Sequence, residues 1–445
     1  MTELYDTDVL VIGAGPAGAI LADVLARQGI RVTLVERATS AERSFRGETV
    51  SALSVKIMKD LGYGERLRES GYLPLEGIAF REDGKELLSA DYRRFPIGQL
   101  PIDMPQPQLL GVAIDAARSA TDFKFLPGTQ FLSLIEEGDV VKGAVLRRAG
   151  GEAYEVRARL TVGCDGRFSR VRKLSGLEAK VTPMPRDFLW FKLPRPDNWQ
   201  QTSQLVVSSD RHLVILPTWP DLLRVGYNVP KGGFGDQRQK GIEAFHDGIA
   251  ALDPRLADLV REHVTSWNDV SLLDIFTAEL DEWARDGLLL IGDSSHTVTP
   301  ILGQGVNLAI QDAICFAPVI YHAITEGTET VPAAAMRAVM AERRKHKAMI
   351  TSFQRMQEAN LAQHTRFGTF LRRLKMRFLH NSPVKYKVLN RTLNAPHGLR
   401  SSEEYVSLLE RLIPISTPVT SVTPSPQPVK PASAAFEDAV NVNAA

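Results

Sequence analysis

A glycine-rich turn near the N-terminus constrains the fold of this chain more than any other segment. An apolar run over residues 8–12 predicts a strand, a helical pattern follows over residues 16–28, and a second predicted strand ends at Glu36. Glycines in such a turn allow a tight bend and close approach to a pyrophosphate, while an acidic residue about 20 positions later can accept ribose hydroxyls. The sequence therefore predicts a Rossmann-type unit that binds an ADP group, and Glu36 disfavours NADP there. The predicted site consists of Gly13, Gly15, Ala17, Gly18 and Glu36.

A second pattern of strand, turn and helix covers residues 288–313. The apolar run 288–291 predicts a buried parallel strand, and Gly292 lets the backbone turn at its carboxyl end. Asp293 then lies where a ribityl or ribose hydroxyl would need an acceptor, and a helix is predicted from Val306 to Ala313. Its free N–H groups and positive dipole end would face a loop suited to an electron-rich ring with negative charge, such as a reduced flavin. That loop contains Pro300, Gly303 and Gly305.

Composition narrows the class of protein. At 445 residues with 44% hydrophobic content, the chain is long enough for two or three domains, and its net charge of +1 gives no reason to expect nucleic acid. Cys164 and Cys315 are far apart and have no CxxC spacing, so we expect neither a metal site nor a disulfide. The N-terminus lacks signal-peptide features, and no apolar run has the roughly 18 residues that span a bilayer. We therefore expect a soluble, cytoplasmic protein.

The predicted elements divide into an α/β part, a β-rich part and a helical part. Short strands dominate residues 182–274, interrupted by one helical insertion at 237–251, whereas residues 331–412 have helical periodicity. The expected boundaries are 1–74 with 107–180 and 286–330 for a cofactor-binding domain, 75–106 with 181–285 for a β-rich substrate domain, 331–412 for a C-terminal helical region, and 413–445 for a disordered tail.

The C-terminal helical region is strongly basic between residues 343 and 400. Apolar side chains interleave with its cations, among them Phe370, Leu371, Leu374, Phe378 and Leu379. This pattern fits helices that contact a membrane surface or an acidic partner. It also fits ordinary helices with an apolar core face and solvated cations.

Three separated motifs together resemble the fingerprints of the single-component (class A) FAD-dependent aromatic hydroxylases. The motifs are the glycine-rich turn with Glu36, the segment Asp165-Gly166 with Ser169 and Arg172, and Gly292-Asp293 with Pro300 and Gly303-Gln304-Gly305. The resemblance covers about 330 residues, within which the motifs run from Gly13 to Gly305. It implies an α/β protein of the para-hydroxybenzoate hydroxylase-like fold, with a Rossmann-like FAD-binding domain, an inserted and mainly antiparallel β substrate domain, and a C-terminal helical region.

The resemblance also implies roles for individual residues. Gly13, Gly15, Ala17 and Gly18 would bind the pyrophosphate, and Glu36 with Arg37 the adenosine ribose. Arg46 and Gln108 would contact the phosphate and ribityl regions, and Gly292 with Asp293 the ribityl hydroxyls. Pro300, Gly303, Gly305, Val306 and Asn307 would line the isoalloxazine ring. Asp165, Ser169 and Arg172 would serve FAD and transient NAD(P)H engagement, although Asp165 and Arg172 could instead pair to tie a strand to a helix.

The implied reaction is that of an NAD(P)H-driven monooxygenase, with O₂ as co-substrate and either NADH or NADPH as donor. Such an enzyme hydroxylates an aromatic or polyketide-like small molecule through a C4a-(hydro)peroxyflavin. The sequence does not identify its catalytic residues. The pocket candidates are His296, Glu48, Tyr227 and His212, for each of which a purely structural role is the alternative, as it is for the strand aromatics Trp190 and Trp219.

Glu48 keeps other reactions open. The run Arg46-Gly47-Glu48-Thr49 also resembles a turn of flavin halogenases and of some polyprenyl reductases. The alternatives are therefore a geranylgeranyl reductase-like enzyme of isoprenoid substrates, a halogenase, or a flavin-binding protein without turnover. The WxWxIP motif of halogenases is absent. The sequence does not decide between a monomer and a dimer.

Overall fold

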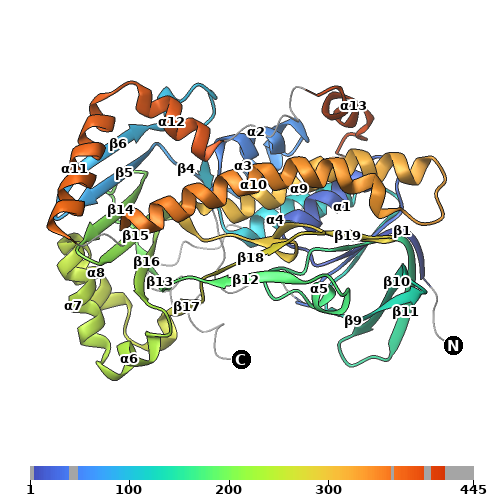
Figure 1. The fold of residues 1–445 in the computed structure, drawn as a ribbon, viewed down its shortest axis with the longest axis horizontal. Helices are drawn as coiled ribbons and strands as arrows, with labels where there is room; N and C mark the ends of the chain where they lie inside the picture. Colours follow the sequence, from blue (N-terminus) through green and yellow to red (C-terminus); the bar gives the residue numbers. More distant parts are fainter. Residues whose placement is uncertain (1–4, 40–48, 362–364, 395–401, 416–445) are drawn as a thin grey trace, which may run out of the picture.

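The computed structural model describes residues 5–39, 49–361, 365–394 and 402–415. Arg46, Gly47 and Glu48 lie outside the described residues, and so does the part of the expected disordered tail 413–445 from residue 416 onward. The roles expected above for Arg46 and Glu48 therefore stay predictions. The chain forms one elongated α/β molecule with two main sheets, as Figure 1 shows. The predicted fold class is confirmed.

The first main sheet has a parallel centre. Its strand order is β19-β20-β11-β1-β2-β8, and all neighbouring pairs from β20 to β8 are parallel. Strands β9 and β10 continue from β11 as an antiparallel meander. The strands are β1 (Tyr5–Ile12), β2 (Val32–Val35), β8 (Phe123–Leu126), β9 (Thr129–Glu137), β10 (Val140–Arg148), β11 (Ala153–Gly163), β19 (Ala284–Arg285) and β20 (Leu288–Leu290).

Apolar helices pack with this sheet to form the largest core. Helix α1 contacts both α4 and α9, and α10 lies along α9 (Figure 1). Every residue of α1 from Ala17 to Ala26 is buried, which explains its lack of a polar face. The helical segment Ile301–Thr325, which is kinked at Leu302, is long and apolar enough to cross a membrane, but 78% of its most apolar stretch is buried, as in a core helix. The helices are α1 (Pro16–Ala26), α4 (Gln106–Ala117), α5 (Arg170–Leu174), α9 (Gln304–Thr325) and α10 (Ala333–Leu361).

The second main sheet is mostly antiparallel and has the order β17-β13-β16-β15-β14-β5-β6. Only the pairing of β14 with β5 is parallel, so two distant parts of the sequence join in one sheet. The strands are β5 (Gly77–Glu82), β6 (Lys85–Asp91), β13 (Arg186–Pro194), β14 (Thr202–Ser208), β15 (Arg211–Thr218), β16 (Leu222–Pro230) and β17 (Ser271–Leu273).

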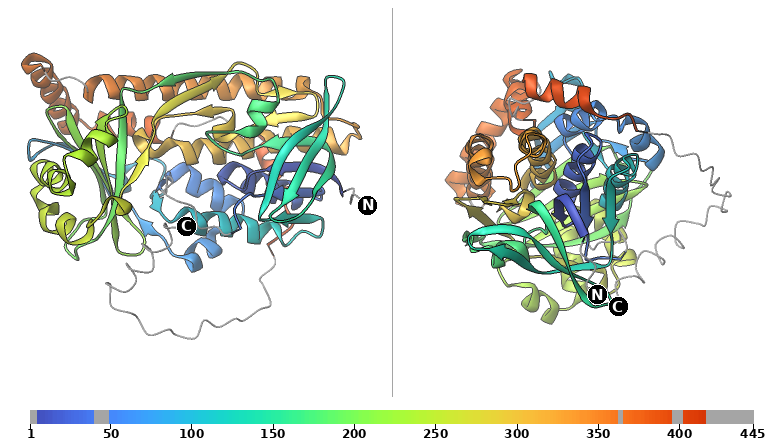
Figure 2. Two further views of the ribbon diagram at one scale, coloured as in Figure 1. Left: turned by 90° about the horizontal axis from the view of Figure 1, so that it is seen from below. Right: turned by 90° about the vertical axis from the view of Figure 1, so that its right-hand side faces the viewer.

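The predicted single helical insertion at 237–251 is wrong in its extent. Three helices pack on the outer face of the second sheet instead, α6 (Phe234–Gln239), α7 (Ile242–Leu252) and α8 (Ala257–His263), as Figure 2 shows. Gly241 separates α6 from α7 at a φ of 91°, and Pro254 follows the end of α7. A left-handed glycine and a proline are both common where a helix ends.

Two small sheets and the remaining helices complete the fold. The sheet β3-β7-β4 lies beside α2 and α3, and the sheet β12-β18-β21 runs between the two main sheets. The strands of the first small sheet are β3 (Thr49–Val50), β4 (Leu73–Pro74) and β7 (Ile102–Asp103). Those of the second are β12 (Ala179–Pro183), β18 (Phe276–Leu280) and β21 (His296–Thr297). The helices are α2 (Ala52–Asp60), α3 (Gly64–Ser70), α11 (Arg366–Asn381), α12 (Val384–Leu393) and α13 (Glu403–Arg411).

Candidate functional site

The parallel strands bring the three sequence motifs to one edge of the first sheet. In the register of the sheet, Ile12 pairs with Gly163 and with Val35, and Gly163 pairs with Leu290. Each of these residues ends its strand or lies next to the end, so the segments that follow them emerge side by side. The carboxyl edge of a parallel sheet is where ligands bind in open α/β folds.

The glycine-rich turn is too crowded for side chains at two positions. A Cβ on Gly13, which has a φ of 103°, would lie 2.5 Å from the Cys164 carbonyl oxygen, and one on Gly18 would lie 2.0 Å from the Gly13 carbonyl oxygen. Helix α1 starts after Gly15 with no side-chain cap. The uncapped N–H groups and dipole of α1 are therefore suited to a pyrophosphate. That this turn binds one stays a prediction.

Glu36 holds its carboxylate against the same turn. Its Oε2 accepts a hydrogen bond from the Ala14 N–H at 2.9 Å, and its Oε1 accepts one from the Ala38 N–H at 3.0 Å. Each carboxylate oxygen has a second lone pair, so these bonds leave acceptor capacity for ribose hydroxyls. The neighbouring Arg37 is exposed.

The Asp165 motif interlocks with the third motif. Asp165 Oδ2 accepts hydrogen bonds from the backbone N–H groups of Arg170 (2.7 Å) and Val171 (3.0 Å), so Asp165 fixes the start of α5 at the end of β11. Arg172 instead donates to the Ser294 carbonyl at 2.9 Å. The motif thus ties a strand to a helix through Asp165, while Arg172 ties that helix to the turn after Gly292. Its role towards FAD and NAD(P)H stays a prediction.

The third motif directs a carboxylate towards the start of α9. Asp293 Oδ1 lies 3.9 Å from where a Cβ on Gly305 would stand. The loop before α9 has left-handed backbone at Leu302 (φ 62°) and Gly303 (φ 60°), and Gly303 provides no side-chain cap. Non-glycine residues in this region are uncommon and often mark ligand sites. The positive end of a 22-residue helix is thereby left open beside Asp293.

Asn307 stabilises this loop from within. Its Oδ1 accepts from the Ser51 N–H at 2.8 Å, and its Nδ2 donates to the Gly303 carbonyl at 2.9 Å. The side-chain amide therefore joins the loop to the start of α2. Of the other predicted ring-lining residues, Val306 is buried, whereas Pro300 and Gly305 are half-buried.

Two buried polar atoms on α4 support a bound polar group at this edge. The Oε1 atoms of Gln106 and Gln108 are buried and have no hydrogen-bond partner among the described residues. Buried amide oxygens are rarely left without a donor in folded proteins. Helix α4 packs against α1. Together with two uncapped helix starts and the carboxylates of Glu36 and Asp293, this donor and acceptor set fits FAD.

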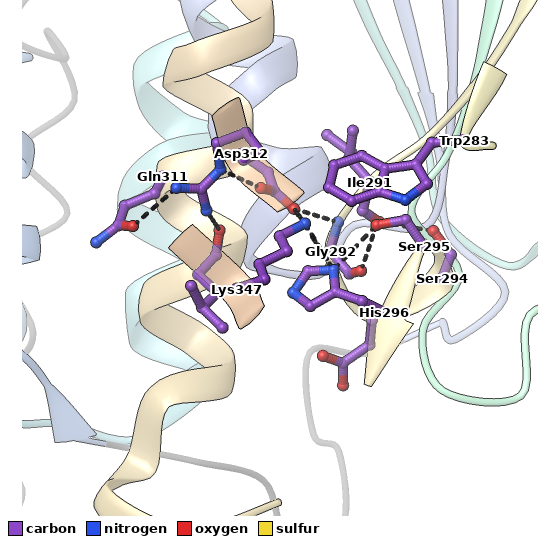
Figure 3. A network of polar contacts seen from close by, with 12 residues as sticks. Trp283, Ile291, Gly292, Ser294, Ser295, His296, Gln311, Asp312 and Lys347 are labelled. Atoms are coloured by element: carbon purple, nitrogen blue, oxygen red, sulfur yellow. Dashed lines mark hydrogen bonds and ion pairs between the residues drawn. The ribbon is translucent and has the colours of Figure 1, made fainter. Parts of the chain in front are cut away.

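A buried ionic cluster contacts the third motif at Gly292, as Figure 3 shows. We call it the Asp312 cluster, and it consists of Asp312 on α9, Arg343 and Lys347 on α10, His296 on β21, and Trp283. Asp312 Oδ2 accepts the Gly292 N–H at 2.9 Å and lies 3.0 Å from Lys347 Nζ, while Oδ1 lies 2.8 Å from Arg343 Nε. The cluster therefore holds the backbone of the third motif through Gly292.

Lys347 is the central cation of the Asp312 cluster. Its Nζ lies 2.7 Å from His296 Nδ1 and 3.7 Å from the centre of the Trp283 ring. Burial lowers the pKa of Lys347 to about 7, although Asp312 partly offsets it. Burial and the neighbouring cation also lower the pKa of His296 far below its usual value. Burial opposes ionisation of Asp312, but Lys347 and Arg343 outweigh it and lower the pKa of Asp312. His296 is thus a neutral acceptor within the cluster.

The second sheet separates the other pocket candidates onto two faces, because side chains alternate along a strand. Tyr227 lies on the face covered by α7, where it packs edge-on against Phe245. Trp190 lies on the opposite face, stacked with Phe188 at 5.6 Å. His212 also contacts Phe188, at 5.2 Å, and burial lowers its pKa to about 3.

Two contacts join the second sheet to the cofactor-binding edge. Asp103 on β7 is fully buried and accepts hydrogen bonds from Thr49 (2.8 Å) and from Thr218. Trp219 fits against Gly71, where a Cβ would lie 2.5 Å from the indole. Trp219 is therefore part of the junction between the sheets.

Sequence reasoning missed four residues that the fold brings together beside the third motif, and one residue on the second sheet. They are Asp312, Arg343, Lys347, Trp283 and Arg224, whose guanidinium lies 4.9 Å above the Trp190 ring. One signal was available, because Asp312 is a carboxylate within a helix that is apolar from Leu308 to Ile310 and from Ala313 to Ile320. A buried charge of this kind requires a partner.

The comparisons with known proteins agree with this geometry. The chain matches the FAD binding domain family over residues 6–354. It is 36% identical over 396 residues to 6-methylpretetramide 4-monooxygenase of Streptomyces rimosus, a match that covers 88% of this chain and 94% of that protein. Two solved structures show the same fold at lower identity. PqsL of Pseudomonas aeruginosa, in complex with 2-aminobenzoylacetate, has a TM-score of 0.71 at 23% identity and covers 82% of this chain and 99% of that chain.

The second solved structure is that of p-nitrophenol 4-monooxygenase PnpA of Pseudomonas putida. It has a TM-score of 0.72 at 17% identity and covers 88% of this chain and 97% of that chain. The family match and the 36% identity confirm the expected hydroxylase family and its FAD cofactor. They favour the monooxygenase reaction over the reductase and halogenase alternatives. The chain belongs to the FAD binding domain family and is a single-component FAD-dependent monooxygenase of the aromatic hydroxylase class.

Proposed function

We propose that this monooxygenase hydroxylates a polycyclic aromatic small molecule of the polyketide type. The observation that carries the proposal is the aromatic face of the second sheet, where Phe188, Trp190 and Arg224 lie together opposite the helix-covered face. Flat aromatic substrates stack on such rings, and a buried guanidinium favours an ionised phenol oxygen. The similarity to 6-methylpretetramide 4-monooxygenase supports the same substrate class.

We propose that the cofactor is held by the residues of the three motifs. The uncapped start of α1 would bind the pyrophosphate, Glu36 the adenosine ribose, and Asp293 the ribityl hydroxyls. Gln108 would contact the ribityl and phosphate region, and the start of α9 would stabilise negative charge on the ring. Bound FAD supplies the redox chemistry of the class, in which NAD(P)H provides reducing equivalents and O₂ provides the oxygen atom.

The protein's own residues contribute orientation, charge and exclusion of water. Arg224 would hold a phenol oxygen as its anion, which makes the ring carbon beside or opposite that oxygen more nucleophilic. His212 cannot supply a proton near neutral pH, because burial lowers its pKa to about 3. We therefore assign His212 a role in packing the aromatic face against Phe188.

Turnover with a polycyclic phenol tests the proposal. Purified full-length chain, loaded with FAD, should oxidise NADH or NADPH faster when 6-methylpretetramide is added. It should also yield a product heavier by one oxygen atom, and isotopically labelled O₂ should mark that atom. Complete turnover without O₂, or no labelled product from any polycyclic phenol, would refute the proposal.

A variant pair refines the test. Arg224→Met should raise the pH at which the reaction is fastest, because the phenol would then ionise less readily, and should weaken substrate binding by about tenfold. Arg238→Met on α6 removes a cation from the other face of the sheet and is the matched control. Equal effects of both substitutions would contradict the role of Arg224.

A further inference from the structure

Helix α11 presents an apolar face outward. Phe367 and Phe378 are 75% and 78% exposed, and three other large apolar side chains on the helix are also exposed. At 100° per residue all five fall on one side of the helix. They are Phe367, Phe370, Leu371, Leu374 and Phe378. The interpretation of α11 as an ordinary helix with its apolar face in the core does not account for this surface.

The opposite side of α11 is fixed to the second sheet, so the outward face is not an arbitrary rotation of the helix. Arg372 forms a buried ion pair with Glu82 on β5, with Nη2 2.6 Å from Oε1. Met376 and Leu379 pack against a small core that contains Phe80 and Leu88. The polar contact thus lies inside and the larger apolar surface outside, which is the reverse of an ordinary surface helix.

Cations border the apolar face, and carboxylates are missing from this part of the sequence. Lys375 and Arg377 are exposed and lie on opposite edges of the apolar face. On α12 the exposed side includes Val384, Val388 and the cations Lys387 and Arg391. Residues 366–393 contain eight cations and no Asp or Glu, the cations being Arg366, Arg372, Arg373, Lys375, Arg377, Lys385, Lys387 and Arg391.

The corner between α11 and α12 is hollowed. A shallow hollow of about 530 Å³ is lined by both apolar and polar side chains. The lining residues are Leu374, Arg377, Phe378, Asn381, Ser382 and Pro383. An anionic headgroup could be received by Arg377 and the adjacent amide and hydroxyl groups, while an acyl chain could contact Leu374 and Phe378.

We propose that the outward face of α11 and α12 docks on the surface of a bilayer that contains anionic phospholipids. Amphipathic helices of this kind lie in the plane of the interface, with aromatic and leucine side chains inserted and cations at the headgroup level. Each Lys or Arg near an anionic surface strengthens the attraction. The exposed apolar side chains and the one-sided charge are then both accounted for.

A second copy of the chain is a poorer occupant of this face. Self-association would bring two surfaces together that carry only cations, and like charges across an interface are repulsive. A soluble acidic protein would satisfy the charge, but the shallow hollow between α11 and α12 is lined by six residues, far fewer than a stable protein interface uses. Figure 1 places α11 and α12 at the end of the molecule that carries the second sheet. Docking would therefore bring the proposed substrate-binding part close to the bilayer.

Vesicle binding by the full-length chain tests the inference, and its outcome does not depend on the reaction catalysed. The chain should co-sediment with vesicles of phosphatidylcholine and phosphatidylglycerol, and much less with phosphatidylcholine alone. Binding should weaken at high salt, because screening reduces the attraction between exposed charges. Lys375→Glu with Arg377→Glu should lower the partition coefficient by about thirtyfold or more. Phe370→Ser with Phe378→Ser should lower it by about tenfold or more.

Matched variants separate a specific surface from general charge. Arg147→Glu with Arg148→Glu reverses two exposed cations on β10, at the other end of the molecule, and changes the net charge equally. Val406→Ser on α13 removes an exposed apolar side chain elsewhere. Both controls should bind vesicles like the unmodified chain. Equal loss in the β10 variant, no binding to either vesicle, or a dimer that dissociates on the Phe370 and Phe378 substitutions would overturn the proposal.

Discussion

The two basic stretches of the C-terminal helices have opposite surroundings. On α10, Arg343 and Lys347 are buried and paired with Asp312. On α11, Lys375 and Arg377 are exposed at the edges of an apolar face. Both stretches have cations interleaved with apolar residues in the sequence. The comparison shows that such a pattern does not reveal which side of a helix faces the protein, since a carboxylate on another element decides it.

The energetic consequences of the two arrangements differ. A buried cation is tolerated only with a partner, because removal from water is costly and pairing offsets that cost. An exposed cation keeps its water and can exchange it for a lipid phosphate. Substitutions in the Asp312 cluster should therefore change stability, whereas substitutions on the outward face of α11 should change association.

Asp312→Asn should have the largest effect. The substitution leaves Arg343 and Lys347 buried without a carboxylate, which should lower the free energy of unfolding by about 3–5 kcal/mol. Urea unfolding followed by far-UV circular dichroism measures it. Asp258→Asn, at an exposed position of α8, should cost less than about 0.5 kcal/mol. If the two variants were equally stable, the cluster would not hold the third motif in place.

Glu82→Gln should have the next largest effect, because it removes the anchor of α11. Arg372 would stay buried with a neutral partner, at a cost of about 2 kcal/mol in the free energy of unfolding. Trypsin should then cleave within α11 sooner, which mass spectrometry of the fragments would show. Glu86→Gln on β6 is exposed and serves as the control. Unchanged cleavage would mean that apolar packing alone fixes α11.

Lys347→Met should change how stability depends on pH. Burial lowers the pKa of Lys347 to about 7 in the folded chain, whereas an unfolded lysine titrates near 10.4. Between these values the unfolded chain binds more protons, so folding stability rises with pH; below about pH 7 both states are protonated and this group adds no slope. The unmodified chain should therefore show a slope greater by about 1 kcal/mol per pH unit than Lys347→Met. Lys345→Met, at an exposed position, is the control. If the free energy of unfolding depended on pH in the same way for Lys347→Met and the unmodified chain, the lowered pKa of Lys347 would be contradicted.

Lys375→Glu with Arg377→Glu should have the smallest effect on stability. Both side chains are exposed, so the free energy of unfolding should change by less than about 0.5 kcal/mol. Thermal unfolding in the absence of lipid measures it. A loss of several kcal/mol would show that this face is covered within the protein, contrary to its proposed docking role.

Local features of the sequence predicted much of the cofactor edge. Glycines at 13 and 18 are required by contacts within the turn and with the end of β11, and their spacing is visible without a structure. In the first sheet, β2 is a short, mostly apolar run that ends before Glu36, and β20 is a short apolar run between Gly287 and Gly292. For these elements the physical cause and the sequence signal lie within about 20 residues of each other.

Features that depend on distant contacts were harder to predict. Arg343 lies 31 residues from its partner Asp312 in the sequence, and Arg372 lies 290 residues from its partner Glu82. The face of the second sheet on which Tyr227 lies depends on where α7 packs, and no residue near Tyr227 indicates it. His296 lies on β21, and its contact with Lys347 could not be predicted without the position of α10.

The order of the parallel strands also bears on how the enzyme is made. The proposed cofactor site takes residues from Gly13, Glu36, Gln108 and Asp293, so a ribosome must finish roughly two thirds of the chain before all of them are present. Asp312 then needs cations that follow on α10. A truncated chain that ends before α10 would contain every cofactor motif and yet leave a buried carboxylate unneutralised. Flavin capture should therefore come late in biosynthesis, after α10 has emerged and packed.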